Sequence, residues 1–99
     1  MTAVAEFLKQ NRTRFESDLF DWLRIPSIGT DPAYDEQTRA AGNWLADKFR
    51  ALSLKTEVIE TCRHPLIYAE SPPVPGAPIV LVYGHYDVQP PDPLDLWKS

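Results

Sequence analysis

The chain has 99 residues, of which 43% are hydrophobic, and its 14 acidic and 10 basic residues give a net charge of -4. This length is enough for one small domain, and the apolar content is too high for a disordered protein. The acidic balance argues against a nucleic-acid partner, which usually needs a basic face, and no apolar run approaches the roughly 18 residues that span a membrane.

The first predicted element is an amphipathic helix over about residues 3–24. Its apolar residues recur at helical spacing with charged residues between them. They are Val4, Leu8, Phe15, Leu19, Trp22 and Leu23. Pro26 ends the helix because the residue before a proline is disfavoured in the helical conformation, and residues 26–32 form a loop rich in turn formers.

A second helix is predicted over about residues 35–52. Acidic residues open it and basic residues occupy its last turns, an arrangement that complements the helix dipole. Trp44 lies on its apolar face and is predicted to be a core residue.

Three strands are predicted after the helices. Residues 55–61 alternate polar and apolar side chains, and residues 66–70 form a second short strand. A proline-rich loop over 71–78 leads to residues 79–85, which begin with five apolar residues. A strand that is apolar on both faces is usually central in its sheet. The order of helix, helix, strand, strand, strand predicts an α/β fold with a three-stranded sheet.

Two titratable side chains, His85 and Asp87, stand at the end of the last predicted strand, in the sequence VLVYGHYDVQP. Ligands of open α/β sheets bind outside the carboxyl ends of strands, and side chains two positions apart in an extended chain share a face. Imidazole is a common metal ligand, and it binds best when its other ring nitrogen donates to a carboxylate. One interpretation is therefore a metal site at His85, and the other is a surface hydrogen-bonded pair.

The remaining candidates for chemistry are weaker. His64 lies in the turn between two predicted strands and is interpreted as a solvated turn histidine. The single cysteine, Cys62, excludes an internal disulfide and fits a reducing cytoplasm, and the N-terminus lacks a signal-peptide core. No serine is placed as the nucleophile of a Ser-His-Asp triad, and Gly84 alone does not make a phosphate loop.

The longer pattern YGHYDVQPPDPLDLW, over residues 83–97, closely resembles the first metal-binding segment of the M20 metallopeptidases. Its YDVQP form is most similar to the dipeptidase branch, which includes carnosine-type dipeptidases. Upstream, WLRIPSI over residues 22–28 resembles the early helix-to-loop segment of the same family. The resemblance spans nearly the whole chain.

This resemblance implies that His85 is a metal ligand and that Asp87 is the supporting active-site carboxylate, hydrogen-bonded to His85. It implies a cofactor of two zinc ions, with manganese or cobalt as alternatives, and small peptide or amide substrates. It also implies a homodimer for the full-length enzyme. Tyr86 and Gln89 match the branch without an assigned role and are interpreted as packing residues.

The resemblance further implies that the chain is incomplete. The family's other ligands, its general base and its lid and dimerisation domain all follow the matching segment. Zinc sites take three or four protein ligands, and one imidazole cannot hold two metals about 3.5–4 Å apart. Residues 1–99 are thus expected to form the N-terminal part of a three-layer catalytic domain and to be inactive alone. The alternative is a small non-enzymatic α/β interaction module, or the product of a degraded gene.

Overall fold

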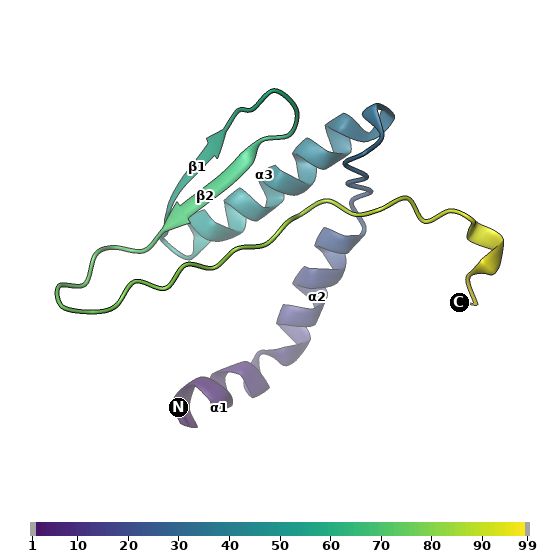
Figure 1. Cartoon of the computed structure of the whole chain (residues 1–99). Helices are drawn as coiled ribbons and strands as arrows, with labels where there is room; N and C mark the ends of the chain where they lie inside the picture. The colour runs from purple at the N-terminus through teal and green to yellow at the C-terminus, as the bar shows by residue number, and fades with distance from the viewer. Residues whose placement is uncertain (1, 99) are drawn as a thin grey trace.

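The computed structural model describes residues 2–98 and has a mixed α/β fold (Figure 1). Three α-helices precede a two-stranded sheet, and short 3-10 helices lie before the third helix and near the C-terminus. The elements are α1 Thr2–Gln10, α2 Arg12–Leu23, η1 Pro32–Tyr34, α3 Asp35–Ala51, β1 Lys55–Ile59, β2 Leu66–Glu70 and η2 Leu94–Leu96. In the part of the chain that the structure describes, no helix has the length and apolar character needed to cross a membrane.

The first predicted helix is interrupted, so the expectation of one continuous helix over 3–24 is wrong. Asn11 separates α1 from α2, and the two helices meet at an angle (Figure 1). The backbone N–H and the side-chain amide of Asn11 both donate to the carbonyl of Phe7, at 3.1 and 2.9 Å. At Asn11 the backbone leaves the helical region, with φ -105° and ψ 10°, and asparagine favours such a break because its side chain bonds to nearby backbone groups.

The second predicted helix is confirmed as α3, which ends one residue before the expected position. The short turn η1 leads into it, and the Asp31 side chain accepts from the Ala33 N–H at 3.0 Å. After α3 the chain turns at Ser53, whose φ of 61° lies in the left-handed region. This turn brings β1 back along α3.

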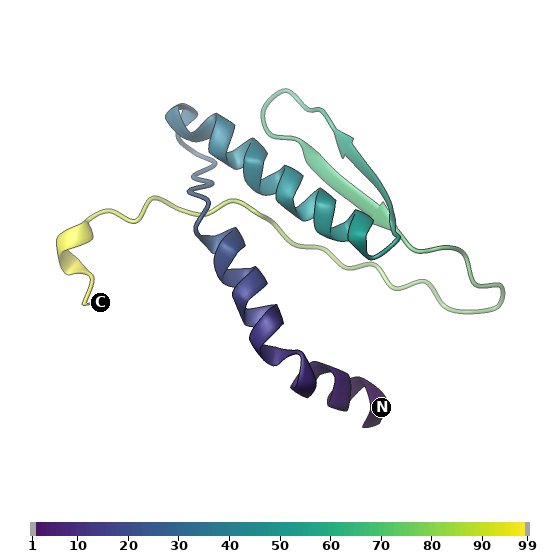
Figure 2. The ribbon, with the colours of Figure 1, turned by 180° about the vertical axis from the view of Figure 1, so that it is seen from behind.

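The strands β1 and β2 form an antiparallel hairpin whose register runs from Lys55 opposite Glu70 to Ile59 opposite Leu66. Both predicted strands are therefore confirmed, the first being two residues shorter than expected. Exposed and half-buried residues alternate along each strand, and α3 lies beside the hairpin (Figures 1 and 2). The fully buried positions of α3 carry small side chains, which lets the helix approach closely. They are Thr38, Ala41, Gly42 and Ala46.

A pair of tryptophans joins α2 to α3. The rings of Trp22 and Trp44 stack with centroids 5.7 Å apart, and the Trp22 indole N–H donates to the Ala41 carbonyl at 3.0 Å. Trp44, predicted as a core residue, is half-buried in this stack. Lys48 Nζ lies 2.8 Å from an Asp18 carboxylate oxygen and thus adds an ion pair between the same two helices.

The third predicted strand, 79–85, is absent from the described structure, so this prediction is wrong. The five apolar residues from Ile79 to Tyr83 are 80–97% exposed. A strand needs a neighbour for its N–H and C=O groups, and within residues 2–98 the strands β1 and β2 pair only with each other. Apolar composition marks a segment that favours burial, but it does not supply the neighbouring backbone.

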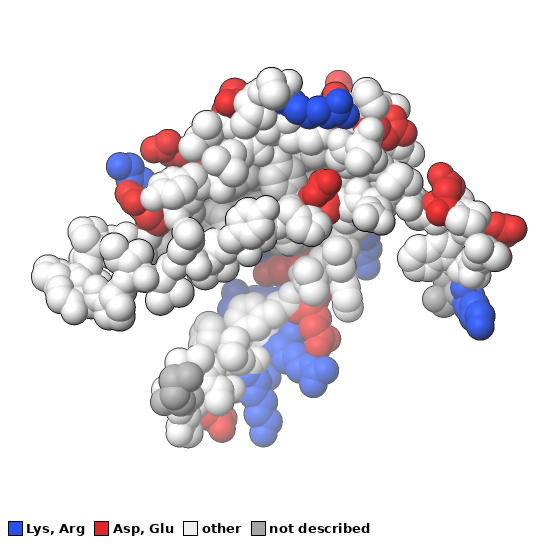
Figure 3. Space-filling model, in the orientation of Figure 1, with Lys and Arg blue, Asp and Glu red and all other residues white. Residues whose placement is uncertain are grey.

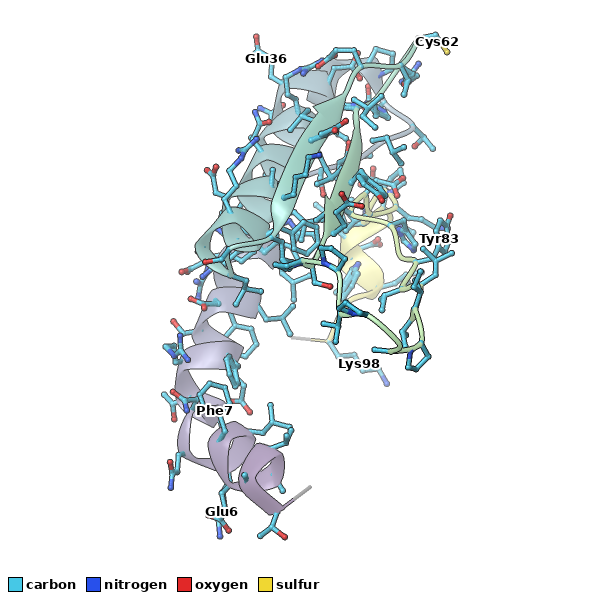
Figure 4. All side chains as sticks on the ribbon, turned by 90° about the vertical axis from the view of Figure 1, so that its left-hand side faces the viewer. Glu6, Phe7, Glu36, Cys62, Tyr83 and Lys98 are labelled. Carbon is cyan, nitrogen blue, oxygen red and sulfur yellow. The ribbon has the colours of Figure 1, made fainter. Side chains whose placement is uncertain are left out.

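The extended segment from Ser71 to Tyr83 forms an uncharged and apolar part of the surface. No lysine, arginine, aspartate or glutamate occurs in it, and the lobe at the left of Figure 3, where the proline-rich loop lies, is uncharged. Figure 4 shows Tyr83 projecting outward on the side away from α3. Exposed apolar surface of this kind is typical of an interaction site.

Candidate metal site

His85 and Asp87 contact each other as the sequence predicts. His85 Nδ1 lies 3.0 Å from Asp87 Oδ1 and 3.1 Å from the Asp87 backbone oxygen. Both oxygens are acceptors, so Nδ1 must donate, and in the neutral form of the ring the proton is on this nitrogen. The other ring nitrogen, Nε2, then keeps its lone pair for a ligand. The imidazole is largely exposed, and the Asp87 side chain is 44% exposed.

The pair is held by the loop after α2 and not by a sheet. Residues Ile28 and Val88 form an isolated parallel bridge, in which the Val88 N–H donates to the Ser27 carbonyl at 2.8 Å. The Ser27 hydroxyl donates to the Tyr86 carbonyl at 3.0 Å. Ser27 and Ile28 are almost completely buried, so this loop is a firm support for the segment that carries the pair.

Gly29, the next residue of this loop, lies against the Asp87 side chain. A Cβ atom at Gly29 would lie only 2.6 Å from Asp87 Oδ2 and 2.9 Å from Asp87 Cβ. Only glycine, which has no Cβ, therefore fits at position 29 in this arrangement. The turn-forming composition of this loop is visible in the sequence, but nothing in the sequence indicates that Gly29 faces Asp87.

Tyr86, between the two candidate residues, packs in the opposite direction. Its ring lies against Gly42 of α3, where a Cβ would approach ring atoms to 3.1–3.3 Å. Its hydroxyl makes a short hydrogen bond to the carbonyl of Pro65 in the β1–β2 turn. Burial raises the pKa of the Tyr86 hydroxyl, which keeps it protonated as a donor. The packing interpretation of Tyr86 is correct but incomplete, because the hydroxyl also fixes the residue to the turn.

His64 is half-buried and bonded, so its description as a solvated turn histidine is only partly right. Its Nε2 lies 2.7 Å from the carbonyl oxygen of Gly29 and must donate to it. Arg63 Nε approaches the same nitrogen at 3.4 Å. That contact cannot be a hydrogen bond at the same time, because Nε2 already carries the proton directed at the carbonyl. Cys62 is exposed at the end of the hairpin (Figure 4).

A shallow open hollow of about 240 Å³ lies beside the pair. Trp22 and Leu23 of α2 form one wall, and residues 85–88 form the other. Its lining is mainly apolar, and it includes the His85 imidazole and the Asp87 carboxylate. The hollow gives a small ligand access to the pair from the α2 side.

The donor set fits one ligand of a metal ion and not a complete site. The imidazole offers Nε2, and the hydrogen bond at Nδ1 is the usual support for a metal-binding histidine. Within residues 2–98, however, no three histidine, cysteine, aspartate or glutamate side chains gather as a metal site would require. Gln89 is exposed and adds no ligand to this pair.

Comparisons with known proteins give one distant similarity at the level of sequence. No family model matches the chain, and no solved structure matches it. The chain is 29% identical over 105 aligned residues to the Cys-Gly metallodipeptidase DUG1 of Candida albicans. The match covers 93% of this chain but 22% of that protein, so the chain spans about a fifth of the length of its curated relative. Over nearly its whole length, the chain is thus distantly similar to part of a metallodipeptidase.

Proposed function

We propose that this chain supplies the first metal-binding segment of an M20-type metallodipeptidase. His85 is the metal ligand through Nε2, and Asp87 is the carboxylate that holds its Nδ1–H. The observation that carries the proposal is the 3.0 Å contact between His85 Nδ1 and Asp87 Oδ1, because it selects the ring tautomer that a metal needs. The distant similarity to a metallodipeptidase supports the same chemistry.

The proposed cofactor is a pair of divalent ions, zinc with manganese or cobalt as alternatives. Such ions act as Lewis acids on a peptide carbonyl when they are bound. The part played by this chain is to present the imidazole, to keep its tautomer fixed through Asp87, and to leave the hollow beside α2 open for a small substrate. Dipeptides are the proposed substrates, and the Cys-Gly dipeptide named for the relative is the first to test.

In this proposal, residues 1–99 are the N-terminal part of a larger catalytic domain. The exposed segment Ile79–Tyr83 supports it, since an apolar strand of this kind needs neighbours on both sides and cover on both faces. In the complete three-layer domain it becomes a central strand. The remaining ligands, the general base and a dimerisation domain belong to the same larger protein, which we place in the cytoplasm.

The decisive experiment uses the product of the complete reading frame, purified and supplied with zinc, manganese or cobalt. Hydrolysis of Cys-Gly is measured for the wild type and for His85→Ala, with the exposed Lys9→Ala as a matched control. We expect His85→Ala to abolish hydrolysis and Lys9→Ala to retain it, because only the former deletes a ligand. The 99-residue chain alone should be inactive. Hydrolysis by His85→Ala, or by the isolated chain, contradicts the proposal.

The second candidate function is a non-enzymatic module that binds a partner protein through its exposed apolar segment. The 80–97% exposure of residues 79–83 is the observation that favours it. A stop codon directly after Ser99, together with a soluble complex formed by the purified chain, supports this candidate. A reading frame that continues into further acidic ligand motifs supports the enzyme.

A further inference from the structure

The turn between β1 and β2 contacts two structures that flank the His85–Asp87 pair. The carbonyl of Pro65 accepts from the Tyr86 hydroxyl, and His64 Nε2 donates to the carbonyl of Gly29 at 2.7 Å. Pro65 is buried and His64 is half-buried. Two consecutive residues of one turn thus anchor the two structures that flank the site, namely the Tyr86 side chain and the loop carrying Gly29.

Tyr86 is fixed at both ends. Its backbone carbonyl accepts from the Ser27 hydroxyl at 3.0 Å, and its ring rests on Gly42 before the hydroxyl reaches Pro65. In an extended chain, alternate side chains point to opposite faces. With the Tyr86 side chain held toward α3, the side chains immediately before and after it are turned to the other face. The Tyr86 contacts therefore determine where His85 and Asp87 meet.

Gly29 acts on the other side of the pair. Its α-carbon stands so close to Asp87 that an added Cβ would reach the carboxylate at 2.6 Å. The loop therefore forms a wall behind the carboxylate. The Gly29 carbonyl receives the His64 N–H at 2.7 Å and a longer contact from Arg63 at 3.3 Å. His64 thus keeps the wall in place without touching either member of the pair.

We propose that His64 and Tyr86 are positioning residues of the metal site. Tyr86 aligns the backbone that carries His85 and Asp87, and His64 fixes the loop against which the Asp87 carboxylate rests. In this role neither residue is a metal ligand. The inference that these residues support a metal site rests on the proposed function. The inference that they fix the positions of His85 and Asp87 concerns the metal-free protein.

The first test compares Tyr86→Phe with Tyr68→Phe in the product of the complete reading frame. Tyr68 is a matched control because its hydroxyl donates to the nearby Glu70 side chain, at 2.9 Å, and not to the turn or the loop that supports the pair. Nitrogen-15 NMR of labelled histidines reports the His85 tautomer, without metal and under conditions where free imidazole is neutral. We expect wild type and Tyr68→Phe to hold the Nδ1–H tautomer and Tyr86→Phe to populate both. Zinc affinity, measured by competition with a chromophoric chelator, should fall about three- to tenfold in Tyr86→Phe. This loss is at or below the roughly 10–100-fold that is typical when a residue bonded directly to a metal ligand is replaced.

The second test replaces His64. His64→Leu removes the donor to Gly29, whereas the side-chain amide of Gln can take the place of Nε2–H in His64→Gln. We expect His64→Leu to weaken zinc binding and mix the His85 tautomers, and His64→Gln to restore both. A purely structural histidine would lower the melting temperature of the Leu variant without moving either readout. If His64→Leu does not fold, the His85 tautomer and the zinc affinity of Tyr86→Phe and His64→Gln decide whether the positioning role holds.

The outcomes separate this inference from the proposed function. An unchanged His85 tautomer and unchanged zinc affinity in Tyr86→Phe and His64→Leu overturn the positioning role, whether or not the protein is a dipeptidase. Retained hydrolysis in His85→Ala overturns the dipeptidase proposal, whether or not the tautomer depends on Tyr86. A shifted tautomer together with weaker zinc binding supports the positioning role.

Discussion

Replacing Asp87 by Asn separates a supporting carboxylate from a surface bystander. The Asp87 side chain is 44% exposed, and its Oδ1 lies 3.0 Å from His85 Nδ1. Asn keeps the size of the side chain and an oxygen that can accept from the same N–H, but it removes the negative charge. For a side chain with this exposure, we expect the free energy of unfolding without metal to change by no more than about 0.5 kcal/mol.

The effect on metal binding should be larger. A hydrogen bond to a charged group contributes about 1.5–3 kcal/mol, and one between neutral groups about 0.5–1.5 kcal/mol. The difference of about 1–1.5 kcal/mol corresponds to roughly a 5- to 12-fold change in affinity. The His85 side chain is 77% exposed, so water screens part of the interaction. We therefore expect a loss of about fivefold, at the lower end of this range and somewhat below the roughly 10–100-fold typical of outer partners of metal ligands.

The assay titrates zinc into wild type, Asp87→Asn and the control Asp21→Asn, all made as the product of the complete reading frame. Asp21 is an exposed carboxylate on α2 that pairs with Arg24 at 2.9 Å, far along the chain from the pair. Turnover of Cys-Gly and the metal-free melting temperature are measured on the same samples. Equal zinc affinity and equal turnover for Asp87→Asn and wild type would refute the supporting role of Asp87. A large drop in the metal-free melting temperature would show that its role is structural.

Three further predictions follow from the fold. Backbone amides of residues 79–83 should exchange hydrogen almost without protection in the isolated chain and become protected in the complete protein, and mass spectrometry measures both. The hydrogen bond from Arg39 lowers the pKa of Glu60, so the stabilisation by this pair is present at neutral pH and is lost as the pH falls through that lowered pKa. The stability difference between wild type and Glu60→Gln should therefore shrink in acid, as pH-dependent denaturation curves will show. Trp22→Phe removes the indole N–H that bonds to Ala41, and it should lower the free energy of unfolding by about 1–2 kcal/mol in urea titrations.

The local elements were predictable because their signals are local. The charge pattern and apolar spacing of α3 placed it to within about one residue, and alternation placed β1 and β2. The contact between His85 and Asp87 was also predictable, since two residues in an extended segment reach each other without help from the rest of the fold. The break at Asn11 was missed because apolar spacing continues on both sides of it and conceals a single poor helix former.

The sequence alone determined the hairpin, α3, and the identity of the candidate ligand His85 and its carboxylate partner Asp87. Tertiary structure decided the rest, because it depends on contacts between distant residues. Residues 79–83 have strand composition, yet the described chain offers them no pairing backbone, so they remain extended and exposed. The supports of the site join residues 21 positions apart between Tyr86 and Pro65, and 35 positions apart between His64 and Gly29. No periodicity connects such positions, and only folding the turn onto the loop and onto α3 brings their donors and acceptors within hydrogen-bonding distance.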